Sequence, residues 1–543
     1  MHIAVPSDAG SRATAAYNLG QLNHSKKLLH RLLVEMWFSS TKDEDIVINN
    51  QLESVSDSES LDHEKSSLPL KRGFKDRHIS LLALAGIIGP GILVGAALPT
   101  SNGPLSLLIG FGVIGLIAFS MMQSLGELAT LYPLGNVFST LGNKFMDRAI
   151  GGTIGWNYAI IWIAVLANEY NTVAAIMQFW GPQVPLYGYI LIFWFAFLAF
   201  QFLGVASFGE AEYWLALCKI VGIVAFYLFA IIYASGGVKG HKAFGFEYWH
   251  NPGSLSNGFK SVVSTFVFAS TFYSGTESIA IAASEARNPS RALPKAVRQT
   301  FVRILVIYMG IAFFYGLTVP YNDPNLTEGN KTIKSPMTVA IKRAGWDGGA
   351  HLVNAFILLT CVSAINSSIY IGSRTLTHLA NEGSAPRILS RVNGRGVPYF
   401  AVILFNLFGL ISLMNVKTGA AKAYLYIVNL SGVAVFIVWG AVNVYHLRFR
   451  KAWKLQGRSL DELPFRGMWF PYLPIFGVVI NVFLGLIQGW STFKPFSAKD
   501  FVDAYILLPF SLVLFLFLKF VNKTKWISLD QVDLDEGRRK DLD

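Results

Sequence analysis

The sequence has few charged residues and few cysteines for its length. Only 14% of its 543 residues are Asp, Glu, Lys or Arg, whereas 53% are hydrophobic. So little charge cannot cover the surface of a water-soluble protein of this size, and the apolar residues lie in long runs. The sequence therefore predicts an all-α polytopic membrane protein. Both cysteines, Cys218 and Cys361, lie within apolar runs and indicate neither a disulfide framework nor a Cys-based metal site.

Other common signatures are also missing. The sequence has no nucleophile beside a base, no metal-ligand cluster and no phosphate-binding loop, so we expect no enzyme, no metal and no cofactor. Residues 1–15 lack the apolar core of a cleavable signal peptide. The formal net charge is +12, but the basic residues are divided among short segments between apolar runs, as membrane orientation requires. We therefore expect membrane lipid, and no nucleic acid, around this chain.

About twelve apolar segments follow residue 78, most of them near the roughly 20 residues that a spanning helix needs. They predict a transmembrane domain at 78–521, between tails at 1–77 and 522–543. The predicted spans are 79–100, 105–131, 155–180, 187–204, 213–234, 262–283, 304–319, 352–371, 400–414, 423–444, 472–490 and 501–520.

Lys and Arg are concentrated in alternate connecting segments, which places both tails in the cytosol if the count of spans is even. We expect the plasma membrane as the location, with an internal membrane as the alternative. The glycosylation sequons at Asn325 and Asn330 then face outward. The N-terminal tail is polar and is expected to be largely disordered. Its serine-rich acidic cluster at 53–60 could be a target for a kinase or for ubiquitin, although simple solvation also accounts for it.

The first predicted span is interrupted at its middle by Gly89, Pro90 and Gly91. Non-helical backbone at this depth survives only where it is buried in protein or faces a watery cavity. The second half-helix would begin near Pro90, and its free N–H groups at Gly91, Ile92 and Leu93 could hold a carboxylate. Taken alone, the interruption favours a kink that packs against a neighbouring helix over a site.

A second interruption lies in the sixth predicted span. If the first ten helices form two inverted five-helix repeats, the first and sixth spans correspond, and paired interruptions of this kind indicate a substrate site at the membrane midplane. The pairing favours a site over a kink. The candidates at the second interruption are Phe272 and Tyr273 as gates, with Gly275, Thr276 and Glu277 beside them.

Ionisable residues inside predicted spans are costly and by default functional candidates. Glu127, Glu169 and Lys219 are candidates for proton coupling, because burial can move the pKa of such a group by several units. Each could instead be structural: Glu127 near the interface, the other two as buried charges with partners. Asn366 could line the same cavity as Glu277 or merely bond between helices.

Seven short motifs occur in order along the chain. They are Ile88-Gly89-Pro90-Gly91-Ile92, Ser124-Leu-Gly-Glu127-Leu with Tyr132-Pro133, Gly209-Glu-Ala-Glu212 with Lys219, Ser274-Gly275-Thr276-Glu277, Glu285-Ala-Arg-Asn288-Pro289, Asn366-Ser-Ser-Ile-Tyr370 with Ser373-Arg374, and Gly394-Arg-Gly396-Val-Pro398. Over roughly 71–526 the chain resembles the fungal amino-acid permeases of the amino acid, polyamine and organocation superfamily. It looks most like the broad-range members.

This resemblance implies a LeuT-like fold of 5+5 inverted repeats plus two extra helices, which imports L-amino acids with protons by alternating access. The first interruption would hold the substrate α-carboxylate, and the backbone of the second the α-amino group. Lys219 matches a lysine that in relatives is thought to occupy the place of a sodium ion. Pro90 departs from the small polar residue of many relatives, so the carboxylate contact would depend more on Gly91 and Ile92. The alternatives are a non-transporting amino-acid sensor on the same fold and a membrane-embedded enzyme.

Overall fold

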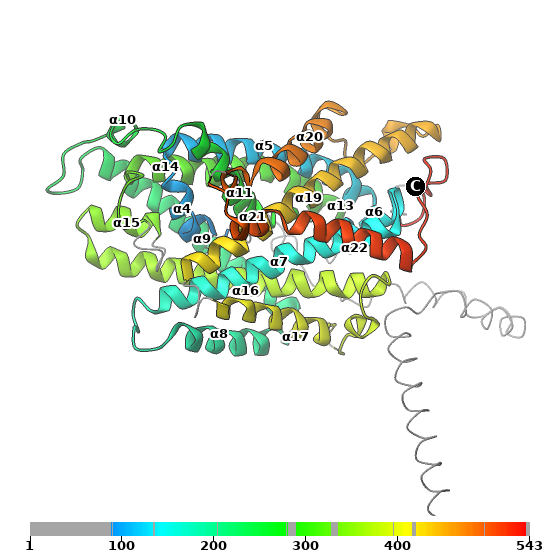
Figure 1. The fold of residues 1–543 in the computed structure, drawn as a ribbon, viewed down its shortest axis with the longest axis horizontal. Coiled ribbons are helices and arrows are strands. Elements are labelled where there is room, and N and C mark those ends of the chain that lie inside the picture. Colours follow the sequence, from blue (N-terminus) through cyan, green and yellow to red (C-terminus); the bar gives the residue numbers. More distant parts are fainter. Residues whose placement is uncertain are drawn as a thin grey trace, which may run out of the picture.

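The structure, a computed structural model, describes residues 88–89, 91–133, 136–202, 205–278, 280, 289–326, 335–394, 396–414, 420–493 and 495–538. Within these ranges the chain is helical, without strands (Figure 1). The α-helices are α4 (Ala97–Thr100), α5 (Pro104–Leu131), α6 (Val137–Phe145), α7 (Arg148–Met177), α8 (Leu186–Gln201), α9 (Val205–Ala234), α10 (Glu247–His250), α11 (Phe259–Tyr273), α13 (Pro289–Arg303), α14 (Gly310–Thr318), α15 (Pro336–Arg343), α16 (Asp347–Asn381), α17 (Tyr399–Phe408), α19 (Ala420–Leu455), α20 (Tyr472–Ile487), α21 (Ala498–Tyr505) and α22 (Leu507–Val521).

Short π- and 3-10-helical pieces continue several of these helices. They are η4 (Gly91–Gly95), η5 (Thr276–Ser278), η6 (Ile304–Met309) and η9 (Gly409–Met414), with η8, η10 and η11 in connections at Arg387–Ser390, Leu460–Glu462 and Trp490–Thr492.

Six helical stretches of the described chain are long and apolar enough to cross a membrane. They are α5, α7, α16, Glu212–Ala234 within α9, Leu425–Leu455 within α19, and Val297–Thr318, which runs from α13 through η6 to α14. The pair of α21 and α22 adds a seventh if it counts as one span. The protein is therefore a multi-pass membrane protein, as predicted. Twelve spans remain a prediction, because several other apolar helices, such as α8 and α20, are shorter.

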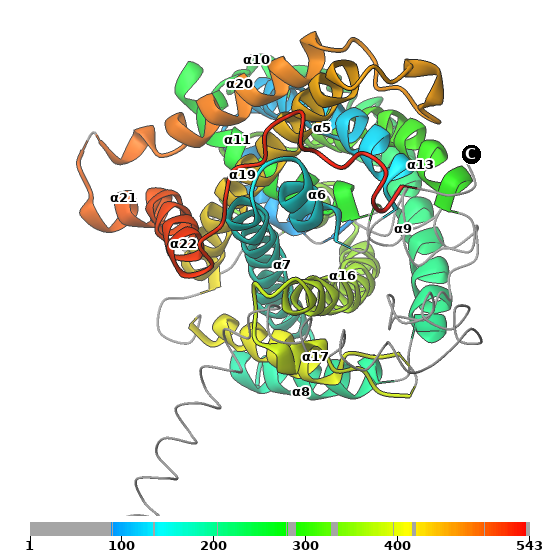
Figure 2. The ribbon, with the colours of Figure 1, turned by 90° about the vertical axis from the view of Figure 1, so that its right-hand side faces the viewer.

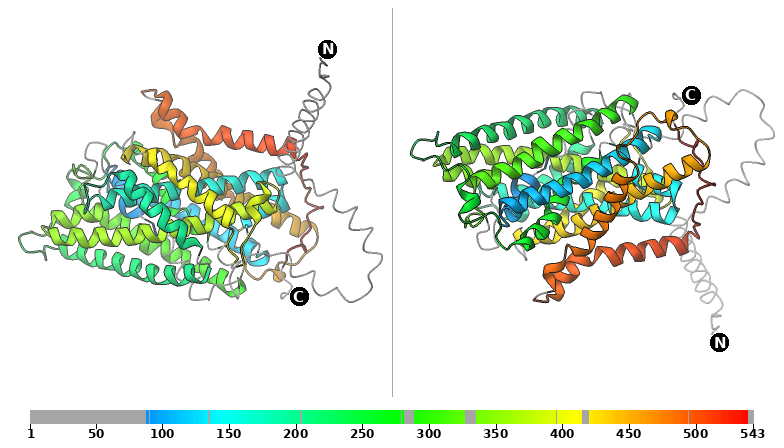
Figure 3. Two further views of the ribbon diagram at one scale, coloured as in Figure 1. Left: turned by 90° about the horizontal axis from the view of Figure 1, so that it is seen from below. Right: turned by 90° about the horizontal axis from the view of Figure 1, so that it is seen from above.

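The last predicted span, 501–520, is divided between α21 and α22. The chain bends by 47° between α21 and α22. Pro509 lies in the first turn of α22, where its ring lacks the N–H that would bond to the carbonyl of Tyr505 and crowds that carbonyl. Figure 3 shows α20, α21 and α22 on the outside of the bundle.

Helix α7 forms the centre of the bundle and packs on α6, α16, α19 and α22 (Figure 2). The most apolar stretch of α7 is 78% buried, against 28% for that of α9, which lies at the edge of the bundle. Glycine permits the close packing: a Cβ on Gly155 would lie 2.6 Å from Leu379 Cδ2 in α16 and 3.0 Å from Ser139 Cβ in α6. Small residues of this kind let membrane helices approach closely.

A buried ion pair joins α5 to α19. The guanidinium of Arg450 donates Nε to Oε1 of Glu127 at 2.5 Å and Nη2 to Oε2 at 2.8 Å. His446 Nε2 lies 3.1 Å from the same carboxylate, and Gly467 N donates to it at 2.6 Å. Glu127 is fully buried, so its charge depends on these partners.

We expect Glu127→Gln to destabilise the protein by roughly 3 to 5 kcal/mol, because Arg450 would stay buried with a neutral partner. Thermal unfolding of the purified protein in detergent measures the loss. The matched control is Asp461→Asn, which removes the carboxylate from an exposed ion pair with Arg466 and should leave the melting temperature unchanged. Equal melting temperatures for Glu127→Gln and the wild type would show that the buried pair is not a structural support.

Candidate functional site

The predicted break in the sixth span is present. Helix α11 ends at Tyr273, and Ser274 leaves the helix with ψ 146°. Gly275 follows with φ +90°, a conformation that favours glycine, and η5 continues the chain as a single 3-10 turn. The chain therefore has non-helical backbone here between two apolar segments, as the sequence predicted.

The predicted break in the first span is also present in the part that can be described. Ile88 and Gly89 are not helical, and a helix begins at Gly91 as η4, which α4 continues to Thr100. Pro90 lies outside the described residues. The second half-helix thus starts where the sequence predicted, and its first N–H groups have no intrahelical acceptor by helix geometry.

A buried cavity of about 50 Å³ lies between the two breaks, with room for a few water molecules. Helices α7 and α16 supply its other walls. It is lined by Gly89, Gly91, Ile92, Trp162, Val165, Asn168, Glu169, Thr172, Thr271, Phe272, Ser274, Ala364, Ser367 and Ser368.

Several polar atoms of this lining are unsatisfied. Asn168 Oδ1, Glu169 Oε2 and Ser368 Oγ are buried without a hydrogen-bond partner among the described residues. Buried polar groups are nearly always paired, so atoms of this kind at a cavity indicate a site that a ligand or water completes. The Asn168 and Glu169 oxygens can accept hydrogen bonds, which suits a ligand that carries N–H donors, and Trp162 Nε1 and Ser367 Oγ of the lining also lack a partner among the described residues.

Five predicted site residues line the cavity: Gly89, Gly91, Ile92, Phe272 and Glu169. The Phe272 ring lies against Gly91, where an added Cβ would come within 2.8 Å of Phe272 Cδ1. A Cβ on Gly89 would lie 3.1 Å from Glu169 Oε1. The two glycines thus bring the first break close to α7 and α11.

The other predicted residues of the second break do not line the cavity. The Tyr273 hydroxyl donates to the Phe111 carbonyl at 3.0 Å, and its ring stacks on Tyr308 with centroids 3.8 Å apart. Thr276 Oγ1 donates to the Tyr273 carbonyl at 2.7 Å. These contacts hold the break against α5 and η6, so both residues support the site without lining it.

Glu277 folds back on its own turn. Its carboxylate accepts from Gly275 N at 3.0 Å and from Trp439 Nε1 of α19 at 3.2 Å. The buried Arg303 of α13 adds a favourable charge interaction with it. Glu277 therefore fixes the shape of the break and ties it to α13 and α19.

Lys219 is fully buried in α9, where the carboxylates of Glu212 and Glu169 stabilise its positive charge. Glu212 is held by Ser363 Oγ at 2.6 Å and by Asn366 Nδ2 at 3.1 Å. The predicted residue Asn366 does not line the cavity. Its Oδ1 instead accepts from Gln201 Nε2 at 2.8 Å, and it connects α8, α9 and α16.

Sequence reasoning missed Glu212 as a site residue. It lies seven residues before Lys219, which is two turns of one helix and places both side chains on the same face. That spacing, together with its place directly before the apolar run 213–234, was the available signal. Glu169 lines the cavity and its charge interacts with that of Lys219. The charged cluster of Lys219, Glu212 and Glu169 is therefore next to the cavity.

The remaining predicted residues lie elsewhere. Glu127 belongs to the ion pair with Arg450 and is not part of the cavity lining. Asn325 is exposed in the connection after α14, where its Nδ2 donates to Asp323 Oδ1 at 3.0 Å. Asn330 lies outside the described residues. Within the described chain no cluster of His, Cys, Asp and Glu has the arrangement of a metal site.

Comparison with known proteins matches residues 78–530 to the family model described as "Amino acid permease". The chain is 60% identical over 477 residues to the general amino acid permease AGP3 of Saccharomyces cerevisiae, which covers 87% of this chain and 86% of that protein. It is 50% identical over 477 residues to an uncharacterized amino-acid permease of Schizosaccharomyces pombe, at 88% coverage of each. A manganese transporter from Eremococcus coleocola aligns with 86% of this chain and 96% of its own, at a TM-score of 0.49 and 13% identity, which identifies no function.

The pairing of Lys219 with Glu212 predicts a non-additive effect on stability. We expect Glu212→Gln and Lys219→Met each to lower the melting temperature in detergent, because each leaves a buried charge with less compensation. The double variant should lose less than the sum of the single losses, with a coupling of roughly 1 to 3 kcal/mol. Additive losses would show that the two charges do not interact.

Proposed function

Since this chain belongs to the amino acid permease family, we propose that it imports L-amino acids of broad range by proton symport with alternating access. The observation that carries the proposal is the cavity between the two helix breaks, where acceptors on α7 have no hydrogen-bond partner among the described residues. A transporter that works by alternating access needs a substrate site between its interrupted helices that opens to one side of the membrane at a time.

The two breaks present opposite helix ends to the cavity. Gly91 and Ile92 lie at the N-terminus of η4, whose positive end favours the substrate carboxylate. Thr271, Phe272 and Ser274 lie at the C-terminus of α11, whose negative end favours the α-ammonium group. An amino acid placed with its two charged groups toward these ends satisfies both.

The remaining lining supports a broad substrate range. Trp162, Val165, Thr172 and Ala364 offer mixed apolar and hydroxyl surface, and Glu169 is the charged side chain of the lining. Such a wall accepts many side chains and demands no single one. The 60% identity to a protein named as a general amino acid permease supports the same range.

We place the proton coupling at Glu169 and Lys219. A protonated Glu169 is neutral in the cavity wall, whereas the negative charge of an ionised Glu169 needs the positive charge of Lys219 to compensate it. Protonation of Glu169 therefore changes the charge that a substrate meets in the cavity, which links protonation to substrate binding. The third candidate, Glu127, is held in its ion pair with Arg450 and His446, which favours a structural role.

The remaining expectations from the sequence are proposals that agree with membership of this family. We propose twelve spans in the LeuT-like arrangement, both tails in the cytosol, and the plasma membrane as the location. We keep Asn325 and Asn330 as glycosylation sites and the N-terminal tail as a target for ubiquitin or a kinase. The alternative function is a sensor that binds amino acids without moving them.

Uptake of labelled amino acids tests the proposed function. Cells that carry the protein should take up several L-amino acids faster than cells without it. The rate should rise as the external pH falls and should collapse with a protonophore. Uptake equal to the control cells across the whole panel would refute transport and favour a sensor, and uptake indifferent to the proton gradient would refute symport alone.

Lys219→Ala should abolish or uncouple uptake while the protein still reaches the cell surface, because the carboxylates around it would lose their counter-charge. The matched control is Cys218→Ala at the neighbouring, exposed position. Uptake and surface labelling are measured on the same cells. Loss of surface protein in Lys219→Ala would assign Lys219 to folding instead.

Gly91→Ala should lower the affinity for substrate about tenfold or more, since the new methyl group displaces the Phe272 ring at the cavity. Gly485→Ala is the matched control, because nothing lies within 4 Å of the added Cβ there. The concentration for half-maximal uptake measures the difference. Similar half-maximal concentrations for the two variants would show that the position of the Phe272 ring does not affect substrate binding.

A further inference from the structure

The segment after α22, residues 522–538, crosses the end of the bundle that carries the C-terminus, over α19, α6 and α5 (Figure 2). We call these residues the C-terminal strap. The strap takes no part in the cavity. Its contacts therefore need an explanation other than the substrate site.

The first part of the strap is fixed to the junction of α6 and α7. Ile527 N donates to the Met146 carbonyl at 2.9 Å. Arg448 of α19 donates to the Ile527 carbonyl at 2.7 Å and to the Phe145 carbonyl at 2.6 Å. One arginine thus connects the strap, α6 and α19.

The second part of the strap is buried. Val532 and Leu534 are 3% and 2% exposed. The hydroxyl of Tyr132, which directly follows α5, donates to the Leu534 carbonyl at 2.7 Å. Gln456, just after α19, donates to the Val532 carbonyl at 2.8 Å. The strap therefore spans from the end of α5 to the end of α19.

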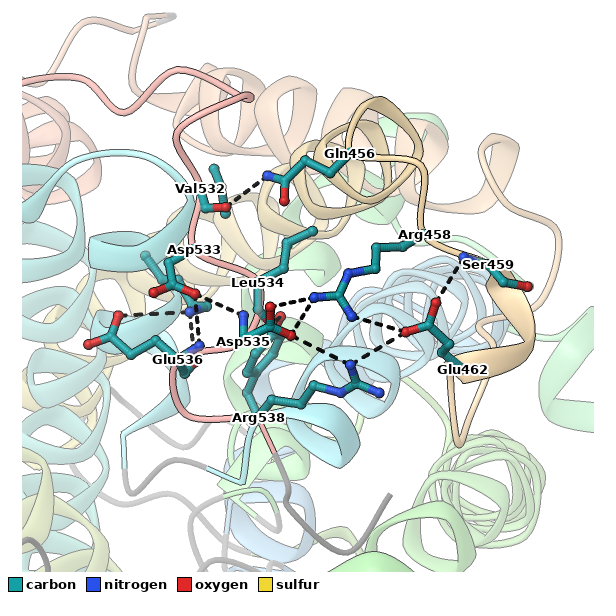
Figure 4. A network of polar contacts seen from close by, with 12 residues as sticks. Gln456, Arg458, Ser459, Glu462, Val532, Asp533, Leu534, Asp535, Glu536 and Arg538 are labelled. Carbon is teal, nitrogen blue, oxygen red and sulfur yellow. Dashed lines mark hydrogen bonds and ion pairs between the residues drawn. The ribbon is translucent and has the colours of Figure 1, made fainter. Parts of the chain in front are cut away.

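Charged side chains close the strap at its last turn (Figure 4). Asp535 pairs with Arg458, and Glu462 accepts from Arg458 at 3.2 Å and from Arg538 at 3.4 Å. Several of these groups are exposed, so each pair contributes little and weakens with salt. Most of the holding strength lies in the buried Leu534.

We propose that the C-terminal strap is a restraint on opening at this end of the permease. The inference rests on the proposed alternating access, which requires the cavity to open toward the cytosol. Helix α5 packs on α11 and η5, which form the second break, and the strap ties the end of α5 to α19. Any opening that separates the ends of α5 and α19 must break these strap contacts. Without the strap contacts the closed arrangement loses stabilisation, so opening costs less free energy and transport becomes faster.

Three variants test the restraint in the full-length protein. Leu534→Ser removes the buried leucine of the strap. Tyr132→Phe removes only the hydroxyl that donates to the strap, so it tests the docking in an intact fold if Leu534→Ser is unstable. Asp530→Asn is the control, because Asp530 is an exposed strap residue. The first readout is trypsin cleavage after the exposed Lys523 and Lys525 in inside-out vesicles, followed through a C-terminal epitope. The second is the initial rate of amino-acid uptake per surface molecule.

We expect cleavage to quicken about tenfold or more in Leu534→Ser and less in Tyr132→Phe, since burial of a leucine changes an equilibrium constant by more than that factor. Uptake should rise by about twofold or more in the same order, and Asp530→Asn should match the wild type in both readouts.

Unchanged cleavage in Leu534→Ser and Tyr132→Phe would overturn the docking of the strap. Faster cleavage with equal or slower uptake would overturn the restraint, because the strap would then only support the fold. A wild-type protein without uptake would defeat the proposed function and the restraint with it, while cleavage would still report whether the strap docks.

Discussion

The cost of unpaired backbone in hydrocarbon controls this structure. Each broken turn inside a membrane loses hydrogen bonds worth several kcal/mol, so a chain keeps such a turn only where protein groups replace them. Glu277 does this at the second break through Gly275 N, and Trp439 anchors the carboxylate in turn. Tyr273 and Thr276 add further bonds. Specific contacts with α5, α13 and α19 therefore stabilise the break.

Sequence reasoning located the breaks but could not orient the side chains around them. Proline and glycine patterns mark interruptions directly, which is why Gly91 and Gly275 were found. Whether a residue lines a cavity depends on helix rotation, which composition does not encode. Tyr273 and Phe272 are neighbours in sequence, yet only Phe272 reaches the cavity. Apolar length also hid the bend at Pro509, because the run of hydrophobic residues continues through it.

The buried charges form clusters that differ in how completely each charge is compensated by its partners. Glu127 meets a bidentate arginine and a backbone donor, so its charge is fully compensated. Glu169 shares Lys219 with Glu212 and keeps one oxygen without a hydrogen bond among the described residues. Satisfied ion pairs hold helices together, whereas an incompletely satisfied group can exchange its proton or its partner. Sequence showed the ionisable residues but not this difference between them.

Several of the polar contacts that dock the C-terminal strap use its backbone atoms. Tyr132, Gln456 and Arg448 all bind its carbonyl oxygens, and Ile527 contributes its N–H. A carbonyl is present whatever side chain the residue carries. Related chains can therefore diverge in the sequence of this tail and keep the same docking, provided that the receiving side chains and a buried apolar residue at the position of Leu534 persist. Evolutionary constraint should be found on the surface that receives the strap, where a comparison restricted to tail sequences would miss it.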